Sequence, residues 1–342
     1  MTTAQAPALN VENLQVEFAV RGGRVQAVRG VSMAVQAGQT LAIVGESGCG
    51  KSVAMMSLLG LIPTPPGRVV AGSAQLQGRQ LLGLPEQQLN RLRGAEIAMI
   101  FQDPMSALNP TMKIGDQIAE TLRVHVGMPR REAWRRAVAL LDRVGVPAAA
   151  ERANQYPFEF SGGMLQRAMI AMSLACKPAV LIADEPTTAL DVTIQNQVLD
   201  LMQELQREMG MAIVLITHDL GVVARMADQV AVMYAGQIVE YGSVEDIFAR
   251  SAHPYTLGLK QAMPAVAGSG ERLAAIAGSP PDLFAPPPGC GFCERCPYAM
   301  SICQRTGPQL LALDAGHSAR CWLQHPQAAG QPAPVYRSEV QP

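Results

Sequence analysis

Residues 45–52 read GESGCGKS and follow directly after the apolar run Leu41–Val44. They match the pattern G-x-x-x-x-G-K-[ST], in which glycines let backbone N–H groups turn inward around phosphate oxygens. An ordinary glycine-rich turn is the alternative, but a buried strand before the pattern and a helix after it favour a nucleotide-binding loop. The lysine of the pattern reaches the β- and γ-phosphates, and its serine hydroxyl binds Mg²⁺. The predicted phosphate-binding residues are Gly45, Ser47, Gly48, Cys49, Gly50, Lys51 and Ser52.

Other apolar runs indicate how the chain around this loop is built. The runs Val180–Ala183 and Ala212–Ile216 are separated by a helical stretch at 192–209, and this strand–helix–strand pattern predicts a parallel sheet. The first 40 residues alternate apolar and polar positions, which predicts short antiparallel strands with turns at 22–23 and 37–38. Further helical segments are expected at 51–60, 114–150 and 162–176.

Two carboxylates, Asp184 and Glu185, end the buried run that begins at Val180. Such a pair can be a solvated feature of a strand end. Together with a phosphate loop, the pattern instead predicts that Asp184 holds Mg²⁺ through water and that Glu185 polarises the water that attacks the phosphate.

A second glycine pair, Ser161-Gly162-Gly163, opens the helix predicted at 162–176. Its backbone N–H groups could bind an anion, whereas a plain helix cap by Ser161 is the alternative. One chain would have little use for two γ-phosphate sites unless two chains meet face to face.

This arrangement resembles the ATP-binding cassette (ABC) ATPases. In that family's order, Gln102 resembles the Q-loop glutamine and a further Mg²⁺ contact, Ala189-Leu190-Asp191 the D-loop, and His218 the switch histidine. Phe18 is the candidate aromatic residue that stacks on adenine, although a core phenylalanine fits almost as well. Taken alone, His218 is more simply a strand-end or helix-capping histidine, and its place in the family order is what favours the switch role. The resemblance implies a RecA-like P-loop NTPase sheet, an antiparallel β-subdomain and a helical subdomain near 103–175, with bound ATP and Mg²⁺.

Longer segments resemble one branch of the family, the ATPases of dipeptide, oligopeptide and nickel importers. They are FQDPMSALNP at 101–110, YPFEFSGGM at 156–164 and HPYT at 253–256. This resemblance implies ATP-driven uptake of peptides, or alternatively of nickel or metal chelates. The implied partners are two transmembrane permease subunits, a second ABC ATPase that could be a paralogue, and an extracytoplasmic substrate-binding protein. The implied location is peripheral, on the cytoplasmic face of the inner membrane, with residues 105–111 near the permeases.

Five of the seven cysteines lie between Cys290 and Cys321. The spacing of Cys290, Cys296, Cys303 and Cys321 resembles the tail of the same branch, some members of which hold a [4Fe–4S] cluster there. Four thiolates suit such a cluster or a zinc ion, and free or disulfide-bonded cysteines are the third possibility. Cys293 is an extra candidate ligand.

Composition sets the remaining expectations. A shift toward proline and cysteine near residue 250 predicts a cassette at 1–250 and a small cysteine-bearing domain at 251–342. The formal net charge of −1 and an aromatic content of 4% argue against a nucleic-acid binder. No apolar run reaches the length of about 18 residues that a membrane helix needs. A non-transport ABC protein would typically carry two cassettes or a long coiled coil, and neither pattern occurs here.

Overall fold

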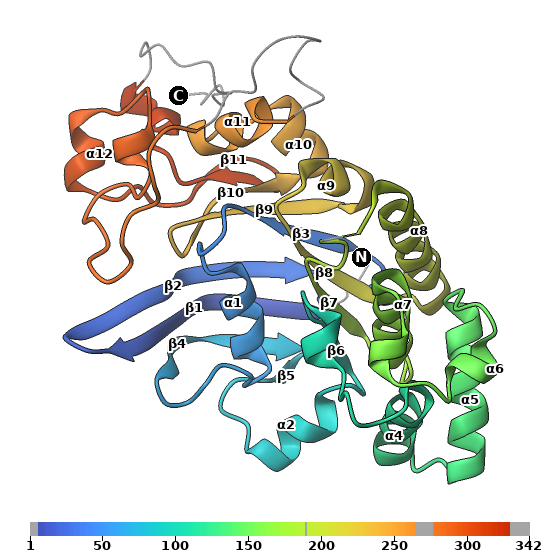
Figure 1. The fold of residues 1–342 in the computed structure, drawn as a ribbon. Helices are drawn as coiled ribbons and strands as arrows, with labels where there is room; N and C mark the ends of the chain where they lie inside the picture. The colour runs from blue at the N-terminus through green and yellow to red at the C-terminus, as the bar shows by residue number, and fades with distance from the viewer. Residues whose placement is uncertain (1–5, 189, 264–275, 329–342) are drawn as a thin grey trace, which may run out of the picture. The chain divides into compact units, whose positions relative to one another are not determined.

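The computed structural model describes residues 6–188, 190–263 and 276–328, and Figure 1 shows their helices and strands. The chain divides into two compact units. The first is formed by residues up to Leu9, 35–40 and 76–216, and the second by 10–34, 41–75 and the residues from Thr217 onward. In the described ranges, no helix has the length and apolar character needed to cross a membrane.

The sheet of the first unit is built from parallel strands, as the strand–helix–strand pattern predicts. β7 (Val180–Asp184) lies between β6 (Ile97–Ile100) and β8 (Ala212–Thr217). Ile100 pairs with Ala183, and Asp184 pairs with Ile216, so the three strands end at one edge. β7 is completely buried, which explains why its sequence is a continuous apolar run.

In the first unit, the helices from α3 to α7 lie within residues 103–175, the range expected to form a helical subdomain. α4, α5 and α7 pack side by side (Figure 1). Gly127, in the left-handed region with φ +71°, ends α4, and Pro129 precedes α5, so the expected helical segment at 114–150 is divided. The elements are β5 (Arg79–Gln80), α2 (Glu86–Leu92), α3 (Pro104–Ala107), α4 (Ile114–Val126), α5 (Arg130–Arg143), α6 (Ala149–Arg152), a 3-10 turn (Pro157–Glu159), α7 (Gly162–Ser173) and α8 (Val192–Met209).

The second unit contains strands of two sheets. In one sheet β1 lies between β2 and β4; in the other, β3 pairs in parallel with β9, and β10, β12 and β11 follow in antiparallel order. The strands are β1 (Leu9–Val20), β2 (Gly23–Val35), β3 (Thr40–Val44), β4 (Gly67–Leu76), β9 (Gln229–Tyr234), β10 (Gln237–Ser243), β11 (Leu311–Asp314) and β12 (His317–Ala319).

The strands expected at the N-terminus are present, but they are not short. The apolar positions between the predicted turns at 22–23 and 37–38 form one strand of 13 residues, β2, and β1 has 12 residues. Gly30 lies inside β2 with φ +83°, a conformation that glycine adopts at little cost. The glycine therefore interrupts the apolar pattern without ending the strand.

In the second unit, a core of buried side chains joins the strands β3 and β9 to the helices α9, α10 and α11. Tyr234, Tyr255 and Phe292 meet there, with ring centroids 4.6–5.4 Å apart. They bring together residues from β9, α11 and the cysteine-bearing segment. The helices are α1 (Lys51–Leu58), α9 (Leu220–Met226), α10 (Val244–Ala249), α11 (Pro254–Gln261) and α12 (Ser301–Arg305), with 3-10 turns at Cys293–Arg295, Trp322–Gln324 and Pro326–Ala328.

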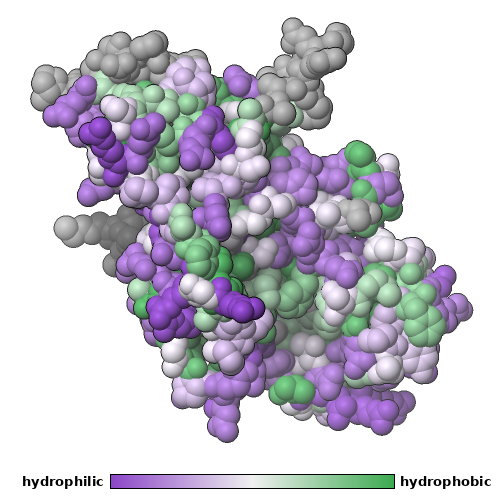
Figure 2. Space-filling model, turned by 60° about the vertical axis from the view of Figure 1, so that its left-hand side comes forward, coloured by the Kyte–Doolittle hydropathy of each residue, from purple (hydrophilic) through white to green (hydrophobic). Residues whose placement is uncertain are grey.

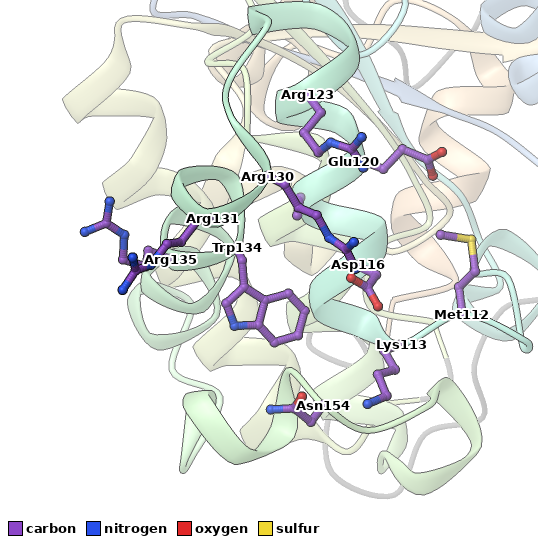
Figure 3. Close-up of a pocket in the computed structure, with 11 residues that line it drawn as sticks. Met112, Lys113, Asp116, Glu120, Arg123, Arg130, Arg131, Trp134, Arg135 and Asn154 are labelled. Carbon is purple, nitrogen blue, oxygen red and sulfur yellow. The ribbon is translucent and has the colours of Figure 1, made fainter.

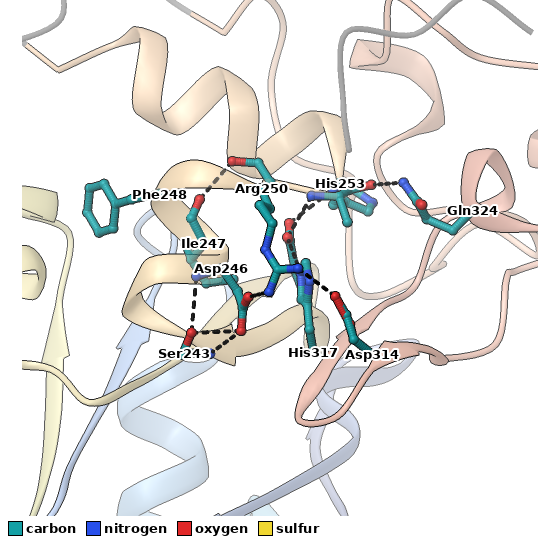
Figure 4. A network of polar contacts seen from close by, with 12 residues as sticks. Ser243, Asp246, Ile247, Phe248, Arg250, His253, Asp314, His317 and Gln324 are labelled. Carbon is teal, nitrogen blue, oxygen red and sulfur yellow. Dashed lines mark hydrogen bonds and ion pairs between the residues drawn. The ribbon is translucent and has the colours of Figure 1, made fainter. Parts of the chain in front are cut away.

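A buried carboxylate, Glu240 of β10, holds the segment that follows this strand. Two residues that contact it, His253 and His317, are labelled in Figure 4. Glu240 accepts hydrogen bonds from the backbone N–H groups of Ala252 and His253, at 2.7 and 3.0 Å, and lies 3.0 Å from Nε2 of His317. Burial lowers the pKa of His253 to about 3, so its ring is neutral at physiological pH. Its Nδ1 accepts from the N–H of Tyr255 and caps α11. The HPYT motif thus has a structural role in this chain.

Candidate functional site

The loop 45–52 wraps between β3 and α1 as the sequence predicts. A Cβ atom on Gly45 would lie 2.1 Å from the carbonyl oxygen of Met233, and one on Gly50 would lie 2.3 Å from that of Ala27. Both glycines also have positive φ, so other residues are excluded for two independent reasons. The loop is therefore pressed against backbone from two strands.

Lys51 is buried in this loop, with 6% of its surface exposed. Its Nζ donates hydrogen bonds to the carbonyl oxygens of Gly45 (2.7 Å) and Glu46 (3.0 Å). The ammonium is thus held inside the curve of the loop, where the motif needs it. Ser52 follows in the first turn of α1, and burial raises the pKa of Cys49.

The predicted carboxylates lie at the edge of the parallel strands in the first unit. Asp184 ends β7 and is 5% exposed; a buried carboxylate of this kind suits metal coordination. Glu185 follows in the left-handed region with φ +46°, and its N–H donates to the carbonyl of Ile216. Such backbone strain is common at functional sites.

The structure brings Gln102 to Glu185. Because β6 and β7 are in register, Gln102 follows its strand at the same edge, and its Nε2 donates to Oε2 of Glu185 at 2.9 Å. Thr188 donates to the same oxygen at 2.9 Å. The sequence analysis missed Thr188, although its place three residues after Glu185 is the spacing of a tight turn.

Ser161 and Asp191 both cap helices. Oγ of Ser161 accepts from the N–H of Met164 at 3.4 Å, so the capping alternative is present in the structure. Oδ1 of Asp191 accepts from Thr193 and Ile194, both at 3.0 Å. A Cβ atom on Gly162 would meet no atom within 4 Å among the described residues, whereas one on Gly163 would touch Ile194 at 3.0 Å. Ala189 of the predicted D-loop lies outside the described residues.

His218 and Phe18 both belong to the second unit. His218 is exposed and stands just before α9, whose N-terminus is capped by Asp219 and not by the histidine. Phe18 of β1 is half-buried, and its ring lies against Gly67 at the start of β4. This contact agrees with the packing alternative for Phe18.

The cysteine-bearing segment forms a cavity of about 740 Å³ that is lined by Cys290, Cys293, Cys296 and Cys303. The N–H of Cys290 donates to the carbonyl of Cys303 at 2.7 Å, so chain segments thirteen positions apart are joined beside the cavity. Cys321 is buried nearby against Leu323. Within the described ranges, all these cysteines are free thiols.

Burial controls the titration of these thiols. It raises the pKa of Cys290 to about 12 and that of Cys296 to about 11, and repulsion from neighbouring cysteines adds to the increase. The pKa of Cys321 is raised for the same reasons. Without a bound cation, they are therefore neutral at physiological pH. Among the described residues, no three cysteine, histidine or acidic side chains are placed to bind one metal ion.

A second cavity of about 890 Å³ lies beside α4 and α5 (Figure 3). Figure 3 shows Trp134 of α5 and Asp116 of α4 at this cavity. The indole packs over Gly115, where a Cβ atom would come within 2.7 Å of the ring. The sequence analysis did not predict this cavity. Its charged lining residues are Lys113, Asp116, Glu120, Arg123, Arg130, Arg131 and Arg135.

The contacts of the loop with the C-terminal region were also not predicted. The N–H of Glu46 donates to the hydroxyl of Tyr255 at 2.8 Å, and the Glu46 carboxylate pairs with Arg295. Neither Tyr255 nor Arg295 belongs to a sequence pattern for phosphate binding. Because 249 positions separate Glu46 from Arg295, only the folded chain shows the contact.

Comparison with known proteins agrees with this geometry. Residues 28–188 match the ABC transporter family, and residues 239–303 match the oligopeptide/dipeptide transporter C-terminal region. The dipeptide transport ATP-binding protein DppD of Bacillus subtilis is 51% identical over 94% of this chain and 96% of its own length. The oligopeptide transport ATP-binding protein OppD of Salmonella typhimurium is 50% identical over 94% of this chain and 96% of its own length.

A solved structure shows the same fold. The dimeric bacterial ABC transporter cassette MJ0796 superposes with a TM-score of 0.62 at 25% identity, over 69% of this chain and 98% of the cassette. The predicted α/β fold with a P-loop NTPase sheet is confirmed. The chain therefore belongs to the ATPases of the ABC transporter family, in the branch with an oligopeptide/dipeptide transporter C-terminal region.

Proposed function

We propose that this chain hydrolyses ATP to drive the uptake of peptides through two permease subunits, to which an extracytoplasmic binding protein delivers the peptide. The observation that carries the proposal is the similarity to dipeptide and oligopeptide transport proteins along nearly the whole chain. The same ATPase role in nickel or metal-chelate uptake is the alternative. A non-transport ABC protein is less favoured, because the similarity includes the transporter C-terminal region.

The proposed location is the cytoplasmic face of the inner membrane, with the chain held there by the permeases. Residues 105–111 are the proposed contact. Support comes from exposed apolar side chains in the helical region: Met105 is 49% exposed and Phe158 is 67% exposed. On the face drawn in Figure 2, hydrophobic residues lie in small groups among hydrophilic ones, as expected for a surface with local contacts.

The proposed active assembly pairs this chain with a second ABC ATPase, which is identical or a paralogue, around two ATP molecules. Each ATP would lie between the loop 45–52 of one chain and the segment equivalent to Ser161–Gly163 of the other. The open space around Gly162 supports this, because it leaves room for a ligand beside the start of α7. His218 is proposed to sense the γ-phosphate, and Asp191 and Phe18 are proposed nucleotide contacts.

Hydrolysis would use the residues at the edge of the parallel strands. Ser52, Gln102 and Asp184 are proposed to hold Mg²⁺, which would neutralise phosphate charge. Glu185 would accept a proton from the attacking water. Gln102 and Thr188 both donate to its Oε2, so the carboxylate is held in one orientation.

Deletion of the gene tests the proposed substrate. We expect the deletion strain to lose uptake of labelled di- and tripeptides and to retain uptake of nickel. Re-expression of the wild-type chain should restore peptide uptake, while the Glu185→Gln chain, made at the same level, should not. Normal peptide uptake with lost nickel uptake would favour the metal-chelate alternative, and unchanged uptake of both would contradict an importer.

We further propose that Cys290, Cys296, Cys303 and Cys321 hold a [4Fe–4S] cluster. Cys290, Cys296 and Cys303 line the cavity of about 740 Å³, and Cys321 is buried nearby. This arrangement supports a cluster, because each thiolate binds a different iron and the four sulfurs need not converge. A zinc ion needs four thiolates at one point, which the described residues do not provide. When bound, the cluster would cross-link the segment and keep its thiolates charged.

Iron analysis tests the cluster. Protein purified without oxygen should be brown and contain about four irons and four sulfides per chain. Cys303→Ser should lose the colour and become more sensitive to proteases in its C-terminal region, because the cross-link is gone. Cys293→Ser is the matched control and should keep both iron and colour. Stoichiometric zinc without iron in the anaerobic protein would contradict the cluster.

A further inference from the structure

An ion pair joins the cysteine-bearing segment to the loop 45–52. The guanidinium of Arg295 meets the carboxylate of Glu46 in a two-pronged contact, with Nη1–Oε2 and Nη2–Oε1 distances of 2.8 and 2.9 Å. The side chain of Arg295 is 6% exposed and that of Glu46 is 26% exposed. A planar fork on a carboxylate fixes orientation as well as charge, so this contact sets where the Glu46 side chain points.

Arg295 is held rigidly from its own side. Its Nε donates to the carbonyl of Ala277 (2.9 Å), and its terminal nitrogens also reach the carbonyl of Ile276 (3.2 Å) and the hydroxyl of Tyr234 (3.1 Å). The hydrogen bonds with Glu46 raise its pKa further above the ordinary value. The guanidinium is thus a fixed positive charge.

Cysteines surround Arg295 in the sequence. It ends the 3-10 turn Cys293–Arg295, and the N–H of Cys296 donates back to the carbonyl of Cys293. The ring of Phe292, just before the turn, packs against Tyr234 and Tyr255. The folded cysteine turns therefore place the guanidinium at the loop.

Glu46 is held through its backbone as well. Its N–H donates to the hydroxyl of Tyr255, and its carbonyl accepts from Nζ of Lys51. Glu46 therefore connects residues after position 250 to the lysine of the phosphate motif. Its carboxylate also adds a negative charge to a loop whose motif binds phosphate, and an unpaired charge of this sign would oppose nucleotide binding.

We propose that Arg295 is a positioning residue for ATP binding, which neutralises and orients Glu46 so that the loop 45–52 accepts the phosphates. The inference rests on the proposed function in one respect, because it takes this loop to be the phosphate site. It does not depend on which solute is transported. It gives the cysteine-bearing segment a direct part in nucleotide affinity.

Substitution of Arg295 tests the proposal on the full-length chain, with a fluorescent ATP analogue as the probe. Arg295→Met should raise the Kd by about tenfold or more, because a charge-assisted contact is lost and the carboxylate is left unpaired. Glu46→Gln should bind the analogue at least as tightly as the wild type. The double variant Glu46→Gln/Arg295→Met should recover most of the lost affinity, because it has no unpaired carboxylate. Arg295→Lys keeps the charge, so its Kd should lie between those of Arg295→Met and the wild type.

The double variant separates this role from a structural one. If Arg295 only held the segment in place, Glu46→Gln would not restore binding to the Arg295→Met chain, and that result would overturn the proposal. Unchanged affinity in Arg295→Met would overturn it as well. Arg320→Met is the matched control, since Arg320 bonds the carbonyls of Ile238 and Pro308 and should leave the Kd unchanged.

The remaining measurements separate this inference from the proposed function. In the assembled transporter, Arg295→Met should raise the KM for ATP and leave kcat close to the wild-type value, because Glu185 and Gln102 are untouched. A fall in kcat at unchanged KM would count against positioning of the loop. Peptide uptake by the wild type is a separate result. Its absence would contradict the assignment as a peptide importer, but it would not change the measured effect of Arg295 on the Kd for ATP.

Discussion

Glu185→Gln should keep ATP binding and lower turnover by at least about a hundredfold, the usual scale for the loss of a general base. The amide has nearly the shape of the carboxylate, so Gln102 and Thr188 can still contact one of its oxygens. It cannot accept a proton from water at physiological pH. The assembled transporter should therefore accumulate with ATP trapped in a closed state, as phosphate release and bound-nucleotide analysis would show.

The partner ATPase must be disabled at the equivalent position in this experiment, because a paralogue could otherwise supply the activity. Glu132→Gln is the matched control: Glu132 is an exposed residue of α5, and its loss should leave turnover unchanged. Near wild-type turnover of the Glu185→Gln assembly would refute the assignment of Glu185 as the base.

Gly162→Val should lower turnover of the assembly by about a hundredfold, the scale for the loss of a fixed donor to a reacting phosphate or carbonyl oxygen. In the isolated chain the valine would meet no atom within 4 Å, so folding and ATP binding at the loop 45–52 should be preserved. In the assembly the same side chain would occupy the space that the facing γ-phosphate needs.

The control for this experiment is Ala139→Val, which places a valine at an exposed position of α5. It introduces the same β-branched side chain on a helix without touching the proposed interface. Binding of a fluorescent ATP analogue and thermal unfolding should be near wild type in both chains, and only Gly162→Val should lose turnover. Loss of nucleotide binding by the isolated Gly162→Val chain would show that the segment is wrongly assigned.

The elements that sequence predicts well are those with local stop signals. The helix at 192–209 has the expected bounds because Asp191 caps its first turn and Gly210, with φ +65°, ends it. Ser161 marks the start of α7 in the same way. Alternation of apolar and polar residues is a weaker signal for length, since the strands expected to be short have 12 and 13 residues.

The same difference between local and non-local signals applies to the residues of the candidate site. Gln102 and Glu185 were both predicted as site residues, but their contact depends on β6, a strand that was not predicted. The contacts of Tyr255 and Arg295 could not be predicted, because no local pattern couples these residues to residue 46. The sequence analysis used HPYT only as a mark of resemblance, whereas the structure gives its tyrosine a hydrogen bond to the loop.

The bracing of the loop 45–52 also affects the thermodynamics of nucleotide binding. Gly45 and Gly50 lie against the backbone at Met233 and Ala27, and Lys51 is already bonded to two carbonyls of the loop. The conformational entropy of ordering these residues is therefore lost when the chain folds and not when ATP arrives. Binding then has little disorder to remove, which favours rapid association and a small entropic penalty.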